Sequence, residues 1–152
     1  MTASTSLPNL VLILADDLGW NMTGHTGNPH VSTPFLDAHV PSQALTLERH
    51  YAYTWCGPSR ASLLTGRVPP RAGVSTHSGE MSTFFGPPTE MTLLPRRLRA
   101  AGYSTAFAGK WDAGMLYREL VPCSATRGFD VCLGYFPGGV DHWTMGVVVP
   151  DE

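Results

Sequence analysis

The chain has 152 residues and a formal net charge of −2, and 43% of its residues are hydrophobic and 14% charged. This composition is typical of a globular domain with one core, which at this length buries roughly 68–70% of the surface of the unfolded chain. The charge balance offers no basic stripe, so we expect no nucleic-acid partner. The longest apolar run, residues 10–15, is far too short to cross a bilayer, so we expect no membrane span.

The first expected element follows a leader of unknown role, residues 1–8, which is polar and small. Residues 9–15 form a continuous apolar run without alternation, a pattern typical of a strand buried on both faces of a parallel sheet. Thr33 and Pro34 predict the start of a short helix, the first as its cap and the second in its first turn. Residues 44–53 alternate loosely and predict a further strand.

A second helix is expected to begin at Pro58, because a proline at the first helical position loses no hydrogen bond. Thr65 and Gly66 can end it, since glycine tolerates the left-handed conformation of a helix C-cap. Cys56 therefore lies where free backbone N–H groups and the positive end of the helix dipole meet, which favours an anion. The plain alternative is that this cysteine is a small buried hydrophobic residue.

The second half of the chain predicts a helix over residues 93–101, capped by Thr92 and closed by Gly102. Residues 103–108 then predict a buried strand, and residues 131–134 a third short strand. Strand, helix and strand in this order indicate an open α/β sheet, whose ligands bind beyond the carboxyl ends of the strands. The sequence leaves open whether the two cysteines of this half form a disulfide.

Two adjacent carboxylates, Asp16 and Asp17, leave the first predicted strand together. They would repel each other unless they are paired, and a hard divalent cation with oxygen ligands is one solution. The alternative is that Asp16 caps a turn while Asp17 faces solvent.

Residues 56–66 read Cys-Gly-Pro-Ser-Arg-Ala-Ser-Leu-Leu-Thr-Gly, which resembles the sulfatase motif Cys-x-Pro-x-Arg followed by Leu-Thr-Gly. In that family a formylglycine-generating enzyme oxidises the cysteine to formylglycine, whose hydrated aldehyde attacks the sulfur of a sulfate ester. The resemblance implies that Cys56 is the precursor of the nucleophile. It also implies that Arg60, one helical turn away, holds a sulfate oxygen and the nucleophile through its planar fork.

Residues 102–111 resemble the second sulfatase motif, which implies that Lys110 contacts the sulfate. The likeness around Asp16 and Asp17 implies that both bind Ca²⁺, or Mg²⁺, together with an oxygen of the formylglycine formed from Cys56. The family pattern continues Lys-Trp-His, whereas this chain has Asp112 in place of the histidine.

An ionised Asp112 cannot donate a hydrogen bond, and it repels a sulfate about 4 Å away by roughly 1–4 kcal/mol at effective dielectric constants of 80 to 20. Because alternate residues of a strand share a face, Asp112 could instead pair with Lys110. We therefore expect weakened turnover.

The resemblance extends from residue 9 to residue 143 and is of the arylsulfatase B-like type. It implies an α/β fold of the alkaline-phosphatase-like class, an α/β/α sandwich with a mostly parallel sheet, of which residues 9–152 are an incomplete N-terminal portion. Because the family's later metal ligands and strands would then be missing, we expect the isolated chain to be poorly stable and inert. The family is usually secreted or lysosomal, but no signal peptide is visible here, so the compartment stays open.

The function implied is hydrolysis of sulfate monoesters on a small molecule or a sugar. Two alternatives remain open. One is a phosphate or phosphonate ester hydrolase on the same scaffold, and the other is a truncated, inactive pseudo-sulfatase.

Overall fold

The computed structural model describes residues 7–75 and 84–144, and the chain divides into two compact units, Met1–Tyr51 and Ala52–Glu152. The first unit contains the 3-10 turn η1 (Gly24–Thr26) and helix α1 (Pro34–Gln43). The described elements of the second unit are α2 (Cys56–Thr65), η2 (Pro69–Ala72), α4 (Leu94–Ala100), β1 (Ala106–Lys110), η3 (Arg118–Leu120) and β2 (Val131–Tyr135). Along the described part of the chain, no helix is long and apolar enough to cross a membrane.

Helix α1 confirms the helix predicted at Thr33 and Pro34, with Thr33 at the N-cap position. The Thr33 hydroxyl makes no capping bond to the helix backbone. It accepts a hydrogen bond from the N–H of Gly24 at 2.9 Å and donates one to the Asp37 carboxylate at 2.7 Å. Thr33 therefore links η1 to the first turn of α1.

The two strands predicted in the first half of the chain are wrong. Residues 9–15 are extended but carry no strand pairing, and Val11 and Ile13 are 84% and 86% exposed. Residues 44–53 likewise form no strand, and Leu45 is 88% exposed. An apolar or alternating run becomes a strand only where a neighbour satisfies its backbone groups, and the described residues of the first unit, which holds residues 9–15 and most of residues 44–53, form no strand.

Strands β1 and β2 pair in parallel, in register from Ala106 opposite Val131 to Lys110 opposite Tyr135. This confirms the parallel sheet and the strand predicted at residues 131–134. Strand β1, Ala106–Lys110, begins and ends later in the chain than the predicted range of 103–108, because β2 offers pairing partners as far as Tyr135.

One position of the pairing, next to its last pair, requires glycine on β2. Gly109 lies opposite Gly134, and a Cβ atom added at Gly134 would lie 1.9 Å from the Gly109 carbonyl oxygen. The close approach of the two backbones therefore leaves no room for a side chain at this point.

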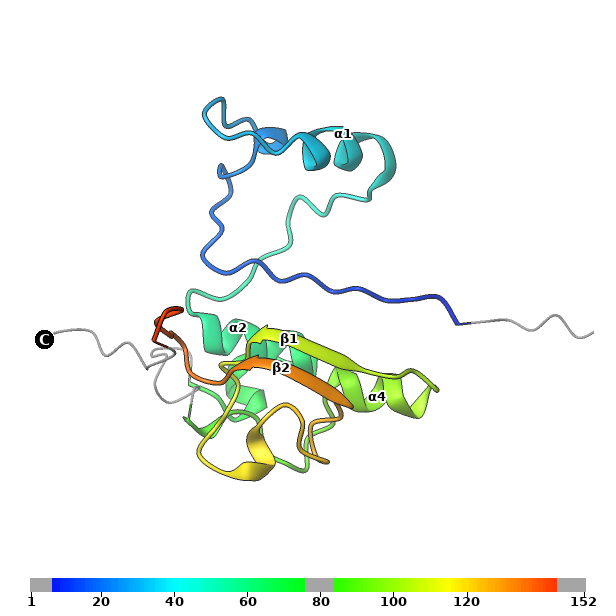
Figure 1. The fold of residues 1–152 in the computed structure, drawn as a ribbon, viewed down its shortest axis with the longest axis vertical. Coiled ribbons are helices and arrows are strands. Elements are labelled where there is room, and N and C mark those ends of the chain that lie inside the picture. Colours follow the sequence, from blue (N-terminus) through cyan, green and yellow to red (C-terminus); the bar gives the residue numbers. More distant parts are fainter. Residues whose placement is uncertain (1–6, 76–83, 145–152) are drawn as a thin grey trace, which may run out of the picture. The chain divides into compact units, whose positions relative to one another are not determined.

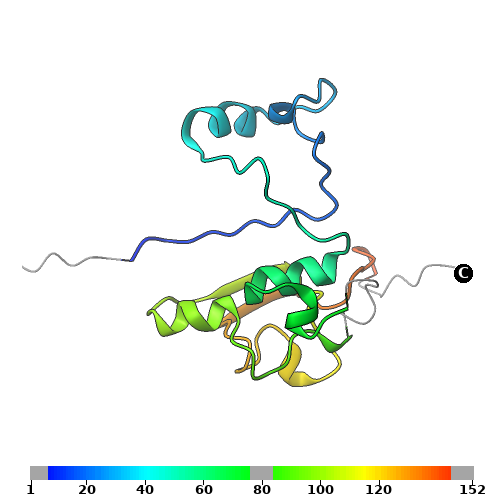
Figure 2. The same ribbon diagram turned by 180° about the vertical axis from the view of Figure 1, so that it is seen from behind.

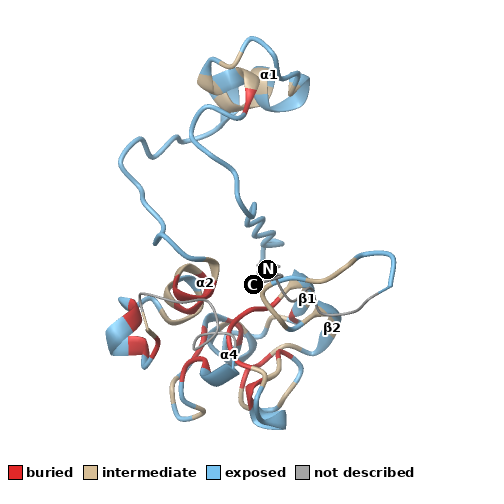
Figure 3. Ribbon diagram, turned by 90° about the vertical axis from the view of Figure 1, so that its left-hand side faces the viewer, coloured by how far each residue is buried: buried red, intermediate tan, exposed pale blue. Residues whose placement is uncertain are grey.

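Helices α2 and α4 cover one face of the two strands, as the front and back views show (Figures 1 and 2). The buried residues of this unit lie mostly in α2, in η2 and in the segments that connect the elements, whereas every residue of β1 and β2 is intermediate or exposed (Figure 3). One apolar cluster comprises Leu93, Trp111 and Ala113, with Leu64, Phe107 and Phe129 packed against it. On β2, Val131 and Leu133 are 65% and 78% exposed, so the expectation of strands buried on both faces is not met by the described residues.

The helix boundaries differ slightly from those predicted. Helix α2 begins at Cys56 and ends at Thr65, and its C-cap residue, Gly66, has a φ of 68°, which confirms the left-handed cap. Pro58 is therefore the third helical residue and not the first, but this position still lies within the first turn, where N–H groups have no intrahelical partner. Helix α4 has Leu93 at its N-cap position where Thr92 was predicted, and Ala101 at its C-cap.

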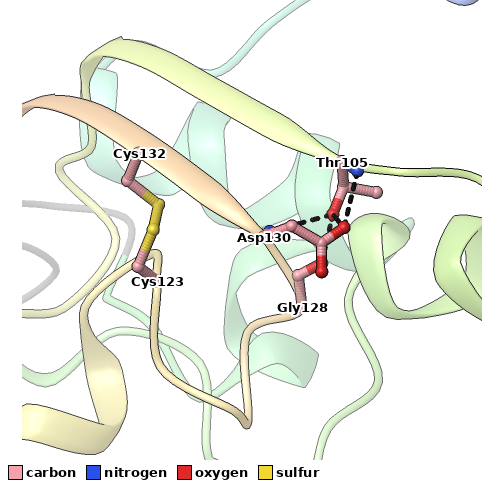
Figure 4. Close-up of a disulfide and its surroundings, with 5 residues drawn as sticks. All are labelled: Thr105, Cys123, Gly128, Asp130 and Cys132. Carbon is pink, nitrogen blue, oxygen red and sulfur yellow. Dashed lines mark hydrogen bonds between the residues drawn. A yellow bond between two sulfur atoms is a disulfide. The ribbon is translucent and has the colours of Figure 1, made fainter.

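A disulfide joins Cys123 to Cys132, with the two Cα atoms 5.8 Å apart (Figure 4). The sequence leaves open whether these two cysteines pair, and the structure shows that they do. The bond links the loop after η3 to β2. Near the start of both strands, the Thr105 N–H donates to the Asp130 carboxylate at 2.8 Å, and the Thr105 hydroxyl donates to the Gly128 carbonyl at 2.7 Å. These bonds fix the register of the sheet at the end opposite to Lys110.

Candidate functional site

Cys56 is the first residue of α2 and is half-buried, and the preceding residue, Trp55, is extended with φ −116° and ψ 151°. The chain is held in this turn by Ser59, whose hydroxyl accepts a hydrogen bond from the N–H of Tyr53 and donates one to the carbonyl of Trp55, both at 2.9 Å. The first N–H groups of a helix have no intrahelical partner and form the positive end of its dipole. Residue 56 is therefore placed beside backbone groups that favour an anion.

Arg60 follows one helical turn later and is only 9% exposed. Its Nη1 donates a hydrogen bond to the backbone carbonyl of Lys110, at 2.5 Å. This bond joins α2 to the last residue of β1, so that the guanidinium lies at the carboxyl end of the parallel strands. In open α/β sheets this end is where ligands bind.

Lys110 and Asp112 contribute their side chains from the same segment. The ammonium Nζ of Lys110 lies 3.9 Å from Oδ2 of Asp112, and the two side chains are 8% and 0% exposed. The pairing predicted from their alternate positions is therefore confirmed. Trp111, between them, packs into the core, and its indole N–H donates to the carbonyls of Gly114 at 2.8 Å and Leu120 at 3.1 Å.

Asp112 has an unusual backbone. Its φ is 46°, in the left-handed region that few residues other than glycine enter, although aspartate is tolerated there. Its N–H donates to the Phe136 carbonyl at 3.0 Å, which continues the pairing of the two strands past their ends. Strained positions of this kind cluster at functional sites, and Asp17, with φ 56°, is another.

The side chain of Cys56 contacts both members of the ion pair. Burial raises the pKa of the thiol above its ordinary value, and a hydrogen bond to Asp112 and the negative charge of Asp112 raise it further. The positive charge of Lys110 and its hydrogen bond act in the opposite direction, with smaller effect. An unmodified Cys56 is therefore protonated near neutral pH and is a poor nucleophile as a thiol.

The structure thus brings three predicted site residues together: Cys56, Arg60 and Lys110. Asp112 joins them as a fourth member, at the position where the sulfatase motif has a histidine. Its alternate spacing with Lys110 predicts their pairing, but contact with Cys56 depends on how α2 packs against the strands.

Asp16 and Asp17 belong to the unit of residues 1–51, and both are exposed. Among the described residues, no group of three or more histidine, cysteine, aspartate or glutamate side chains is gathered for a metal ion. Two adjacent carboxylates are fewer ligands than the roughly six to eight oxygens that Ca²⁺ takes. The described residues therefore do not by themselves complete a calcium site.

Comparison with known proteins gives the family. The Sulfatase family model matches residues 8–148. Mouse (Mus musculus) arylsulfatase J is 34% identical over 149 residues, which cover 94% of this chain and 23% of that protein. Pig (Sus scrofa) N-acetylgalactosamine-6-sulfatase is 38% identical over 121 residues, covering 75% of this chain and 23% of that protein. The chain thus spans about a quarter of the length of these relatives.

A solved structure, Ps i-CgsB in complex with k-i-k-neocarrahexaose, resembles this chain with a TM-score of 0.66 and 30% sequence identity. The match covers 84% of this chain and 28% of that one. Together with the parallel strands and flanking helices, it confirms an α/β fold of the alkaline-phosphatase-like class. Because the Sulfatase family model matches residues 8–148 and arylsulfatase J is 34% identical over 94% of this chain, the chain belongs to the sulfatase family.

Proposed function

We propose that this chain forms part of the active site of a sulfuric ester hydrolase that cleaves sulfate monoesters. The observation that carries the proposal is the cluster at the start of α2, where the Cys56 side chain contacts Lys110 and where Arg60 bonds to the Lys110 carbonyl. One nucleophile precursor and two cations at a helix N-terminus are suited to binding an anionic ester and attacking it.

We further propose that Cys56 is converted to formylglycine by a formylglycine-generating enzyme. Once hydrated, this group supplies an oxygen nucleophile for the sulfur of the ester. The raised pKa of the unmodified thiol supports the proposal, because a protonated thiol at this position offers little reactivity of its own.

Arg60 and Lys110 would hold the sulfate oxygens. As the bond from sulfur to the leaving oxygen breaks, its electron pair and negative charge pass to the leaving oxygen, and fixed cations in a buried setting stabilise the charge on that oxygen and on the sulfate oxygens without reorganisation. The planar fork of Arg60 orients the sulfate, because its donors lie in one plane. Lys110 adds a point charge next to residue 56.

Asp16 and Asp17 are proposed to contribute carboxylates to a Ca²⁺ or Mg²⁺ ion. As they stand, the described residues do not complete such a site. The roles of Arg60 and Lys110 follow from their own positions and charges.

A sulfated sugar or a sulfated small molecule is the proposed substrate. Two relatives support the sugar: one is named N-acetylgalactosamine-6-sulfatase, and the other was solved in complex with k-i-k-neocarrahexaose.

An inactive pseudo-sulfatase is the second candidate, and one observation favours it. Asp112 neutralises Lys110 across 3.9 Å, within a buried site that needs positive charge.

One experiment separates the two functions. The native polypeptide that carries these residues, whatever its length, is isolated, and its tryptic peptide of residues 50–60 is weighed by mass spectrometry. Hydrolysis of 4-nitrophenyl sulfate is measured on the same sample. Formylglycine in the peptide, with hydrolysis that Cys56→Ala abolishes, supports the enzyme. A peptide that retains the thiol, in a protein that hydrolyses no sulfate ester, supports the pseudo-sulfatase.

A further inference from the structure

The charges at the start of α2 do not cancel. Arg60 and Lys110 contribute two positive charges and Asp112 contributes one negative charge, so these three side chains sum to +1. Each is nearly or fully buried, with Arg60 9% exposed and the side chains of Lys110 and Asp112 8% and 0% exposed. Water and salt therefore screen their fields much less than they would at the surface.

The carboxylate of Asp112 is held in place by the fold. Its own N–H is bonded to the Phe136 carbonyl, and its neighbours Trp111 and Ala113 are 1% and 0% exposed. The left-handed backbone at Asp112 is fixed by the same pairing that ends the sheet. A ligand that enters the site therefore meets a fixed negative charge that cannot swing away into solvent.

The side chain of Asp112 also reaches the reacting position. It contacts the side chain of Cys56, the residue from which the nucleophile is proposed to form. When an ester is bound so that residue 56 can attack it, its anionic group therefore lies beside the Asp112 carboxylate as well as beside Arg60 and Lys110.

We propose that Asp112 is a specificity-determining residue, which makes the site select esters with one negative charge over esters with two. This inference rests on the proposed function. A sulfate monoester carries a single negative charge, whereas a phosphate monoester carries about −1.5 to −2 at neutral pH. Whatever the total positive charge of the site, the second negative charge of the phosphate ester meets a further repulsion from the buried Asp112 carboxylate, which the sulfate ester does not meet.

The alternative role for Asp112 is mechanical: it would only hold Lys110 in position. The two roles differ in one measurable quantity. If Asp112 only supports Lys110, its substitution lowers the hydrolysis rates of the sulfate and phosphate esters to a similar extent. If its charge repels the substrate, its substitution raises the hydrolysis rate of the doubly charged phosphate ester relative to that of the sulfate ester.

The test is Asp112→Asn in the native polypeptide, with kcat/KM measured for 4-nitrophenyl sulfate and 4-nitrophenyl phosphate. Asparagine has the same shape and also tolerates the left-handed backbone, so the variant removes the charge and leaves the geometry. We expect the ratio of kcat/KM for the sulfate ester to kcat/KM for the phosphate ester to fall by about fivefold or more. A change of about fivefold corresponds to the weakest repulsion expected between two unit charges about 4 Å apart.

Glu119→Gln is the matched control, since it removes one negative charge from an exposed residue and should leave the ratio unchanged. Asp112→Ser is the second variant, and a thermal melt shows whether each variant is folded. A wild-type measurement needs no variant: the singly charged methyl ester of 4-nitrophenyl phosphate should bind more tightly than the doubly charged 4-nitrophenyl phosphate.

An unchanged ratio in folded Asp112→Asn and Asp112→Ser overturns the specificity role and leaves the proposed function standing, as does tighter wild-type binding of the doubly charged ester. A wild-type protein that neither binds nor hydrolyses any of these esters overturns the proposed function as well.

Discussion

At the scale of single residues, Asp112 stands where the sulfatase motif that this chain resembles has a histidine. The sequence shows the departure but not its setting. In the structure the carboxylate is fully buried, paired with Lys110 and in contact with Cys56. A negative charge beside the proposed nucleophile opposes binding of any anionic substrate, which is the physical basis of the expected weak turnover.

The first prediction concerns that charge. Asp112→His in the native polypeptide should raise kcat/KM for 4-nitrophenyl sulfate by about fivefold or more, because it removes a repulsion of roughly 1–4 kcal/mol and adds a hydrogen-bond donor. Histidine is among the residues that enter the left-handed region, so the backbone can be retained. Steady-state kinetics check the result, and an unchanged rate would contradict the repulsion.

The second prediction concerns Arg60. Arg60→Lys should lower kcat/KM for the aryl sulfate by roughly 10²-fold or more, the usual cost of removing one donor to a developing charge. Lysine keeps the positive charge but loses the planar fork that bonds to the Lys110 carbonyl. Arg67→Lys, at an exposed arginine just beyond α2, is the control and should retain full activity. Equal activity of the two variants would show that the fork is dispensable.

At the scale of elements, the parallel pair of β1 and β2 decides where the site lies. Its register carries Lys110 and Asp112 to the end of the sheet, and its pairing past Lys110 anchors the backbone of Asp112. The two strands approach so closely at Gly109 and Gly134 that a side chain at Gly134 would have to push them apart.

The third prediction follows from that approach. Gly134→Ala should lower the free energy of unfolding by about 1–3 kcal/mol or more, because the new methyl group overlaps the Gly109 carbonyl. Urea denaturation followed by circular dichroism measures the loss. Gly139→Ala is the control, since a Cβ there meets nothing within 4 Å. Similar midpoints for both variants would mean that the strands separate at little cost.

At the scale of the whole molecule, the second unit is held together by contacts between segments far apart in the chain. The bond from Arg60 to Lys110 spans 50 positions, and Arg127, which is fully buried, donates to the Pro87 carbonyl 40 positions away at 2.6 Å. Burial lowers the pKa of Arg127 to about 10, which leaves its guanidinium charged at neutral pH. The disulfide adds a covalent link between the loop after η3 and β2.

The fourth prediction tests that link. Replacing Cys123 and Cys132 together by serine should lower the free energy of unfolding by about 2–3 kcal/mol, the entropy of closing a loop of this length in the unfolded chain. A reducing agent should lower the urea midpoint of the wild type toward that of the double variant and leave the variant unchanged. A wild type indifferent to reduction would show that the disulfide contributes nothing to stability.

Local features account for what the sequence alone determined. The α/β class, helix α2 with its cap at Gly66, and the likeness of residues 56–66 to a sulfatase motif all depend on neighbouring residues, because caps, turns and motifs act over a few positions. The prediction of Asp16 and Asp17 as metal ligands belongs with these and stays a prediction.

Only the tertiary structure decided which segments became strands and which side chains met. Residues 9–15 have the composition of a buried strand, but composition cannot supply the neighbour whose N–H and C=O groups a strand requires. Contact of Asp112 with Cys56 likewise depends on the register of β1 with β2 and on the packing of α2 against them. These are contacts between residues far apart in the chain, and no local pattern encodes their geometry.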